Sequence, residues 1–330
     1  MTTKSRNLTP RMPASKHQLR LPLVASILAA AAFGPSAEAL LIVPTFDSSI
    51  TGDPNGAAMM TGINFAITQV QSYILNPVTV NIQFKNVNFG LGESSTFGIG
   101  LSYFSYRDHL FNDQTLSTDD MTATATLPFG VVNPVNGSGS VYLNLPLLRA
   151  LGENVLGDNQ GGFDSTISLN MSLMNLLRTG PQDPLKYDLE QVALHEIQEV
   201  LGAGGGGSTL GGMVTAVGPL DLFRYSANGV RSYDVNAATS YFSIDGGATN
   251  LSYFNQDVAN GDAGDWASTP PNAAPQAQDA FSTPGIQLNL SAAEMRSADV
   301  IGWNIGQVPE PGSLALLGLG MIAVAGRRKR

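Results

Sequence analysis

Residues 40–202 change between two hydrophobic periods, one typical of strands and the other typical of helices. Strict alternation over residues 78–84 (VTVNIQF) predicts a strand with one buried face. Residues 57–74 instead have apolar side chains at helical spacing, and the sequence Asp53-Pro54-Asn55-Gly56 before them is typical of a helix start. The other elements that we expect in this part are strands at 40–46, 96–106, 140–144 and 165–171, and helices at 106–111 and 145–156.

Residues 187–202 (YDLEQVALHEIQEVLG) predict a helix that leads into the glycine-rich segment 203–212, which we expect to be a flexible loop. His195 and Glu199 are four residues apart, so on a helix they lie one turn apart on the same face. Two side chains in that position can hold one metal ion, and Glu196 can then reach a water on the metal. This helix is the candidate functional centre of the chain.

The segment after residue 202 has a different character. It is rich in aromatic and turn-forming residues and ends in a predicted helix at 291–301, where Ser291 and Glu294 have the spacing of a capping box. The whole pattern predicts an α+β fold with a twisted, mixed sheet and an irregular C-terminal subdomain. We expect two lobes, one over residues 40–202 and one over residues 203–307.

The N-terminus has the three regions of a secretory signal peptide. Five basic residues precede residue 21, an apolar run covers residues 21–33, and Ala37-Glu38-Ala39 provides the small residues of a cleavage site. We therefore assign residues 1–39 to a signal peptide, with cleavage before Leu40. The apolar run is short for a membrane span, which makes a retained anchor the less favoured alternative.

The C-terminus combines Pro309-Glu310-Pro311, an apolar run at 313–326 and a terminal basic cluster at 327–330. The basic residues would keep the end of a short transmembrane run in the cytoplasm. The three parts in this order resemble a PEP-CTERM sorting signal over residues 308–330. The resemblance implies transient anchoring in the inner membrane of a Gram-negative bacterium and processing by an exosortase-type peptidase. The protein would then reside in the periplasm, cell envelope or extracellular matrix. An ordinary C-terminal anchor is the alternative.

Composition narrows the possible chemistry. Between residues 40 and 307 there are eight basic residues and 24 acidic ones, a net charge of −16, which argues against nucleic acid or an anionic membrane as a partner. The chain has no cysteine and therefore no disulfides. Only His109 and His195 remain in this body, so a three-histidine metal site within one chain is impossible. Any metal site must be rich in carboxylates, which permits Zn²⁺ and tilts toward Mn²⁺ or Ca²⁺. A dimer that shares ligands is a further alternative.

The segment ALHEIQEVLGAG resembles the HExxH helix of metzincin-type metallopeptidases, with Glu199 in the position of the second histidine. Gly205 stands where metzincins have their third histidine, so that part of the pattern is missing. Leishmanolysin-like peptidases take the third ligand from a Ser-His-Trp sequence further on, and Ala263-Gly264-Asp265-Trp266 resembles it with aspartate in the histidine position. Residues 279–281 and 299–303 resemble the closing part of such domains.

This resemblance implies a zincin-like catalytic domain. It assigns His195, Glu199 and Asp265 as metal ligands, most naturally of Zn²⁺, and Glu196 as the general base that activates a metal-bound water. In zincins an edge strand before the active-site helix lines the substrate cleft, and residues 165–171 are in the right place in the sequence. The function that follows is an exported metal-dependent endopeptidase acting on protein or peptide substrates.

Several alternatives accompany these assignments. Asp221 and His109 are substitutes for Asp265 as third ligand. Asp257, Asp262 and Asp265 lie in a loop that could bind Ca²⁺ instead, although it lacks EF-hand spacing. We expect Arg224 and Arg231 to pair with nearby acids, and Tyr225 and Tyr241 to be core or rim aromatics. The alternative function is a non-catalytic matrix or surface protein, for example of a biofilm, that retains a zincin-like scaffold.

Overall fold

The computed structural model describes residues 39–113, 117–156, 162–205, 217–232, 239–257 and 260–306. The predicted signal peptide up to residue 38 and the predicted sorting signal with its apolar run at 313–326 lie outside these residues. The described residues all belong to one unit that begins at Glu38. The predicted boundary between two lobes at residues 202 and 203 stays a prediction.

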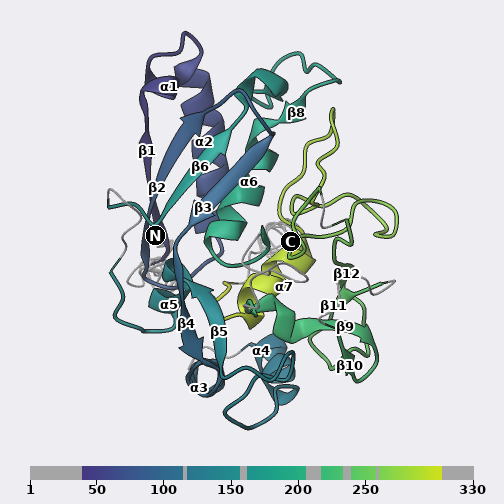
Figure 1. Ribbon diagram of the computed structural model, residues 1–330. Helices are drawn as coiled ribbons and strands as arrows, with labels where there is room; N and C mark the ends of the chain where they lie inside the picture. Colours follow the sequence, from purple (N-terminus) through teal and green to yellow (C-terminus); the bar gives the residue numbers. More distant parts are fainter. Residues whose placement is uncertain are drawn as a thin grey trace, which may run out of the picture. The chain divides into compact units, whose positions relative to one another are not determined.

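A four-stranded mixed sheet contains three of the predicted strands, β1 (Leu41–Phe46), β2 (Thr79–Asn86) and β6 (Ser165–Leu169), together with β3 (Gly92–Thr96) (Figure 1). Their order in the sheet is β1-β2-β6-β3. The first three strands are parallel, whereas β3 is antiparallel to β6. The mixed sheet and the α+β class predicted from the sequence are confirmed.

The expectation that residues 165–171 form the edge strand is wrong. β6 lies between β2 and β3, and alternate residues of this strand are fully buried. β3 is the edge strand, and we did not predict it as a separate element. Its sequence GESST has no apolar residue and hence no hydrophobic alternation, and its residues alternate between half-buried and exposed. The place of a strand in a sheet depends on pairing between distant segments, which local periodicity does not contain.

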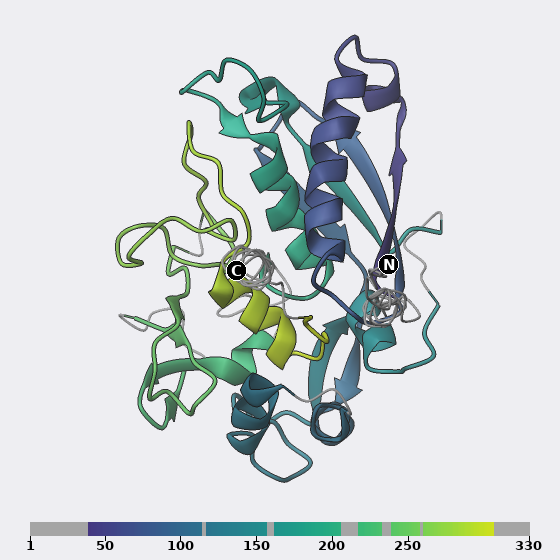
Figure 2. The same ribbon diagram turned by 180° about the vertical axis from the view of Figure 1, so that it is seen from behind.

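Two helices, α2 (Gly56–Gln71) and α6 (Leu189–Val200), lie side by side over the same face of this sheet (Figures 1 and 2). Apolar residues of both helices and of β2 are buried together in the core. Asp188 caps α6 by accepting a hydrogen bond from the backbone N–H of Gln191. The carboxylate of Asp188 also pairs with Arg178 at 2.6 Å. The start of the predicted functional helix is thus stabilised by its Asp188 cap and by the ion pair of Asp188 with Arg178.

The segment between β3 and β6 forms smaller elements. β4 (Gly98–Ser102) pairs antiparallel with β5 (Ser140–Asn144), and the segment includes three helices, α3 (Tyr103–Asn112), α4 (Thr118–Ala125) and α5 (Leu145–Ala150). Most of the predicted strand at 96–106 is therefore β4 and the start of α3. The helix expected at 145–156 ends at Ala150. Four short elements lie outside this segment. They are helix α1 (Ser48–Thr51) before β2, and the 3-10 turn η2 (Met171–Leu173) and the two-residue strands β7 (Met174–Asn175) and β8 (Tyr187–Asp188) after β6.

The segment after the glycine tract forms a small antiparallel sheet in the order β10-β9-β11-β12 (Figure 1). Its strands are short: β9 (Arg224–Ala227), β10 (Val230–Arg231), β11 (Tyr241–Phe242) and β12 (Ser252–Tyr253), preceded by the 3-10 turn η4 (Leu220–Phe223). The closing helix α7 (Ala292–Val300) has the predicted capping box of Ser291 and Glu294. Among the described residues, no helix is long and apolar enough to cross a membrane.

Candidate metal centre

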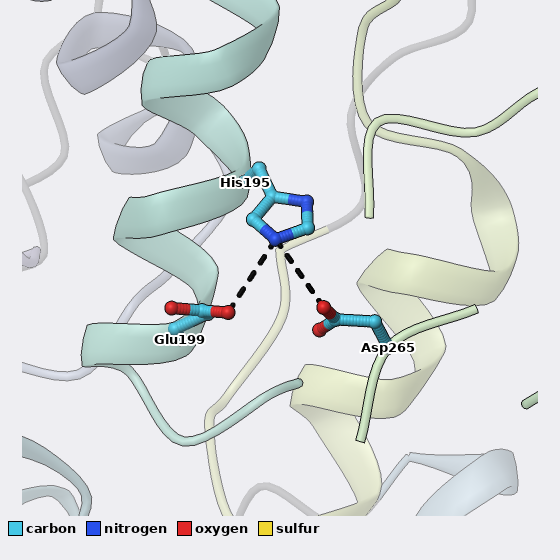
Figure 3. A group of neighbouring side chains, drawn as sticks. All are labelled: His195, Glu199 and Asp265. Carbon is cyan, nitrogen blue, oxygen red and sulfur yellow. Dashed lines mark ion pairs between the residues drawn. The ribbon is translucent and has the colours of Figure 1, made fainter. Parts of the chain in front are cut away.

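Helix α6 presents His195 and Glu199 on one face, and a loop after β12 brings Asp265 to the same point (Figure 3). The Nε2 atom of His195 lies 3.4 Å from Oε1 of Glu199 and 3.4 Å from Oδ2 of Asp265. One ligand atom from each of the three side chains lies within 4.8 Å of the other two. This is the only cluster of three or more His, Asp or Glu ligands with such spacing in the described part of the chain.

A hydrogen bond at Nδ1 orients the imidazole of His195. Nδ1 lies 3.1 Å from the carbonyl oxygen of Ala277, which can only accept a hydrogen bond. Nδ1 therefore carries the proton, and in the neutral ring the lone pair of Nε2 points toward Glu199 and Asp265. A metal-binding histidine commonly donates its second N–H to a backbone carbonyl in this way.

Both carboxylates are held on the side away from His195. Oε2 of Glu199 accepts a hydrogen bond of 2.6 Å from the hydroxyl of Ser94 on β3. Oδ1 of Asp265 accepts hydrogen bonds from the backbone N–H of Gly205 at 2.7 Å and from the side-chain amide of Gln278 at 2.9 Å. In each carboxylate the other oxygen is the one nearest to Nε2 of His195. The donor set therefore fits a cation placed among the three side chains.

The glycines after α6 form a fixed turn against this cluster. Gly205 has a φ of +72°, and a Cβ atom there would lie 2.7 Å from Cδ of Glu199. Gly204 has a φ of +104°, and a Cβ atom there would lie 2.9 Å from Oδ1 of Asp265. Glycine is required because the backbone passes so close to both carboxylates in a left-handed conformation. Residues 203–205 are the described part of the predicted glycine-rich loop and belong to none of the helices and strands given above, and residues 206–212 lie outside the described ranges.

Asp265 is positioned by the residues that follow it as well as by Gly205. The adjacent Trp266 is buried, and its ring lies 5.0 Å from the ring of Phe254 and 5.7 Å from that of Phe242, measured between centroids. The backbone N–H of Trp266 donates to the carbonyl of Gln278 at 3.0 Å. The aromatic contacts thus anchor the loop at the residue next to the carboxylate.

A second chain of contacts connects the cluster to α7. The backbone N–H of Gln278 donates to Oε1 of Glu294 at 2.6 Å, while Oε2 of Glu294 accepts from the N–H of Ser291 in the capping box. The sequence identified Glu294 only as a cap and indicated no role for Gln278. It also missed Ser94 and Ala277. No pattern within the sequence marks these partners, because each acts from a segment distant from α6.

Electrostatics favour a positive charge between the two carboxylates. Burial by itself lowers the pKa of His195, but the negative charges of Asp265 and Glu199 outweigh it and raise that pKa well above its ordinary value. Without a metal, a proton on Nε2 supplies the positive charge. A metal ion would occupy the same position in place of this proton.

Glu196 lies beside the cluster and is nearly enclosed. It is 4% exposed, and its Oε2 has no hydrogen-bond partner among the described residues. Burial, followed by the negative charge of Glu199, raises the pKa of Glu196 well above its ordinary value. Gly92 of β3 packs directly against Oε1 of Glu196, where a Cβ atom would overlap the carboxylate. The edge strand therefore encloses the carboxyl group of the expected general base.

A cleft of about 560 Å³ opens onto these residues. Its lining comes from β3 and the loop before it, from α6, and from the loops at 260–265 and 279–282. Among the described residues, the lining includes six carboxylates and no lysine or arginine. The lining residues are Leu91, Gly92, Glu93, Ser94, Val192, His195, Glu196, Glu199, Asn260, Gly261, Asp262, Asp265, Asp279, Ala280 and Ser282.

The substitute third ligands lie elsewhere. His109 is on α3, with Nε2 at 2.8 Å from Oε1 of Glu153. Asp221 is fully buried, accepts a hydrogen bond from the N–H of Gly218 and lies 3.6 Å from Nε of Arg224. Neither His109 nor Asp221 lines the cleft. Asp265 is the candidate that the structure brings to His195.

The loop alternative for Ca²⁺ is not supported by the geometry. Asp257 is exposed and accepts hydrogen bonds from the side-chain amide of Asn260 at 3.0 and 3.1 Å. Within the described ranges, Asp257 and Asp262 do not form a three-ligand cluster with Asp265.

The two arginines and two tyrosines of the C-terminal part have structural surroundings. Arg224 lies next to Asp221, as expected, and its guanidinium stacks 3.7 Å from the ring centroid of Phe254. Arg231 instead donates to backbone carbonyls, including that of Leu222 at 2.9 Å. Tyr225 is buried in the core, and the hydroxyl of Tyr241 donates to the carbonyl of Gly247 at 2.7 Å. Neither tyrosine lines the cleft.

Comparison with known proteins identifies the C-terminal segment. Residues 307–330 match the PEP-CTERM protein-sorting motif, which confirms the expected sorting signal. This motif marks an exported protein that an exosortase recognises at its C-terminus and sorts to the cell envelope or extracellular space of Gram-negative bacteria. No curated protein and no solved structure matches the chain significantly.

Proposed function

We propose that this chain is an exported metal-dependent endopeptidase that acts on protein or peptide substrates. His195, Glu199 and Asp265 hold a divalent cation, with Zn²⁺ as the first candidate, and Glu196 is the general base. The observation that carries the proposal is the approach of Asp265, distant in sequence, to the same atom of His195 that faces Glu199. The hydrogen bonds that orient the three side chains also support it: Ser94 to Glu199, His195 to the carbonyl of Ala277, and the N–H of Gly205 to Asp265.

When bound, a divalent cation lowers the pKa of water and polarises a carbonyl group. Glu196 supplies the proton acceptor. It lines the cleft beside the cluster, and its Oε2 has no partner among the described residues. Because burial raises the pKa of Glu196, its carboxylate binds a proton more strongly than an exposed glutamate would. The same carboxyl group can then deliver that proton to the leaving amine.

The edge strand provides a place for the substrate backbone. β3 is hydrogen-bonded to β6 on one side, and in the sheet of described strands it has no partner on the other. Residues 91–94 of this segment line the cleft. An extended peptide can add to such an edge through main-chain hydrogen bonds. The scissile carbonyl would then lie over α6, next to Glu196 and His195.

The test combines metal analysis with hydrolysis of a general protein substrate such as unfolded casein. The wild-type protein should contain stoichiometric metal and cleave the substrate. Glu196→Gln should retain the metal and lose about 10²–10⁴-fold in rate, the range for removal of a general base. Glu190→Gln is the matched control, since Glu190 lies on the same helix, pairs with Arg178 and does not line the cleft.

Absence of bound metal after supplementation with Zn²⁺, Mn²⁺ and Ca²⁺ would overturn the metal assignment. Equal residual activity of wild type and Glu196→Gln would overturn the assignment of the base. A protein that binds metal through His195 but hydrolyses nothing would instead be the non-catalytic matrix or surface protein described above as the alternative.

A further inference from the structure

The cleft contains more negative charge than the proposed metal cluster uses. Besides Glu196 and the cluster itself, three carboxylates line it: Glu93 on the edge strand, Asp262, and Asp279. Among the described residues, no lysine or arginine lines the cleft to balance them. Like charges placed around one cavity repel each other unless a cation enters.

Asp279 is the most deeply enclosed of these three residues. It is 3% exposed and lines the cleft. Its Oδ2 accepts a hydrogen bond of 3.1 Å from the backbone N–H of Gln276, whereas Oδ1 is buried without a hydrogen-bond partner among the described residues. A buried carboxylate oxygen with no donor is energetically unfavourable. A cation bound in the cleft would stabilise the negative charge of this carboxylate.

Among the described residues, the remaining carboxylates of the cleft do not form a second three-ligand metal cluster. The described residues contain a single cluster of three or more closely spaced ligands, which is that of His195, Glu199 and Asp265. The other carboxylates do not form a comparable set around one ion. A guanidinium or ammonium group on a flexible side chain is larger than a metal ion and carries several donors. It can therefore contact carboxylates that are too widely spaced to share a metal.

We propose that Asp279, together with Asp262 and Glu93, forms a subsite for a cationic side chain, arginine above all, in the bound polypeptide. The preferred substrates are accordingly basic segments of proteins. This inference rests on the proposed peptidase function of the same cleft and deepens it by naming the substrate class. Substrate backbone along β3 would place side chains within reach of Glu93 on that strand.

Binding can be measured without turnover by using full-length protein in which Glu196→Gln blocks hydrolysis. The probes are two blocked peptides in which a single arginine, or its neutral isostere citrulline, is flanked by three alanines on each side. We expect the arginine peptide to bind about tenfold more tightly or better by isothermal titration calorimetry, since charge-assisted hydrogen bonds are about twice as strong as neutral ones. Adding Asp279→Asn should reduce the arginine-to-citrulline ratio several-fold.

Asp108→Asn is the matched control. Asp108 is exposed on α3 and does not line the cleft, so this change removes the same charge outside the site. It should leave the ratio unchanged. If Asp279→Asn fails to fold, Glu93→Gln, at an exposed position, tests the same prediction with a smaller expected loss.

Equal binding of the two peptides to the starting protein would overturn the subsite, as would an unchanged ratio in Asp279→Asn. The same reduction in Asp108→Asn would also overturn it, because the preference would then reflect net charge. The outcomes separate the two proposals. A protein that prefers arginine without hydrolysing any peptide contradicts the peptidase function alone, whereas a peptidase without this preference contradicts only the subsite.

Discussion

Replacing Gly205 with alanine is a small change that should disturb two proposed metal ligands at once. The new Cβ atom would lie 2.7 Å from Cδ and 2.8 Å from Cγ and Oε1 of Glu199. Those distances are shorter than van der Waals contact, so Glu199 or the backbone must move. The backbone N–H of Gly205 also donates to Oδ1 of Asp265 at 2.7 Å, and a shift of the turn weakens that bond as well.

Two effects of this substitution can be separated by magnitude. The φ of +72° at Gly205 imposes a backbone cost of about 1–2 kcal/mol on any residue with a Cβ atom. Displacing Glu199 and loosening Asp265 adds a loss of metal affinity. Changes to groups that orient metal ligands typically reduce affinity about 10–100-fold. Gly205→Ala should therefore lower both the stability of the metal-free protein and its affinity for Zn²⁺.

Gly137→Ala is the matched control. Gly137 has a similar φ of +76°, and a Cβ atom there would meet nothing within 4 Å. With EDTA present, both variants should lose about 1–2 kcal/mol in the free energy of unfolding from the left-handed backbone, and Gly205→Ala should lose more because its Cβ atom also displaces Glu199. Only Gly205→Ala should lose Zn²⁺ affinity in a competition titration against a chromogenic chelator. Wild-type Zn²⁺ affinity in Gly205→Ala, or an equal loss of Zn²⁺ affinity in both variants, would refute the proposed arrangement of ligands.

Two further predictions concern the support of the site and the pH dependence of the fold. Gln278→Ala removes the side-chain donor to Asp265 and should weaken Zn²⁺ binding about tenfold. Gln276→Ala is the control and should leave Zn²⁺ binding unchanged, because the side-chain amide of Gln276 donates to Ser252 instead. An equal loss of Zn²⁺ affinity in the two variants would contradict the orienting role of Gln278. Burial raises the pKa of Asp120 to about 7 from an unfolded value of 3.8, so its contribution is most favourable below about pH 4 and is lost as the pH rises to about 7. Urea denaturation of metal-free protein over this range should show wild-type stability falling relative to Asp120→Asn, by up to about 4 kcal/mol because one pKa unit corresponds to about 1.4 kcal/mol. An equal pH dependence of stability in the two proteins would contradict this.

Much of the local structure could be predicted from the sequence because it depends on local spacing. The periodicity of residues 187–202 predicted a helix, and α6 occupies Leu189–Val200. Alternation predicted β2, and the serine and glutamate of residues 291 and 294 predicted the capping box of α7. In each case the signal lies within one element, where side chains a few residues apart share a face or a cap.

The prediction was wrong or incomplete where the outcome depends on how distant segments pair. β3 lacks apolar residues, so no periodicity marked it, yet it is the strand that contacts the site. The turn at Gly204 and Gly205 had the composition of a flexible loop. Its conformation is set by the carboxylates against which it packs, which come from α6 and from the loop that carries Asp265.

The sequence by itself determined the chemistry that a metal site in this protein would have to use. With only His109 and His195 in the body, the site had to rely on carboxylates, and the spacing of His195 and Glu199 placed two candidate ligands on one helical face. Apart from the family resemblance, the sequence did not distinguish Asp265 from Asp221 as the third.

Only the tertiary structure shows which of the two aspartates lies next to His195. Burial of Trp266 among aromatic rings and the hydrogen bonds from Gly205 and Gln278 bring the Asp265 carboxylate to His195, while Asp221 is buried beside Arg224. Side-chain chemistry is encoded residue by residue. The meeting of distant residues is the result of packing over the whole fold.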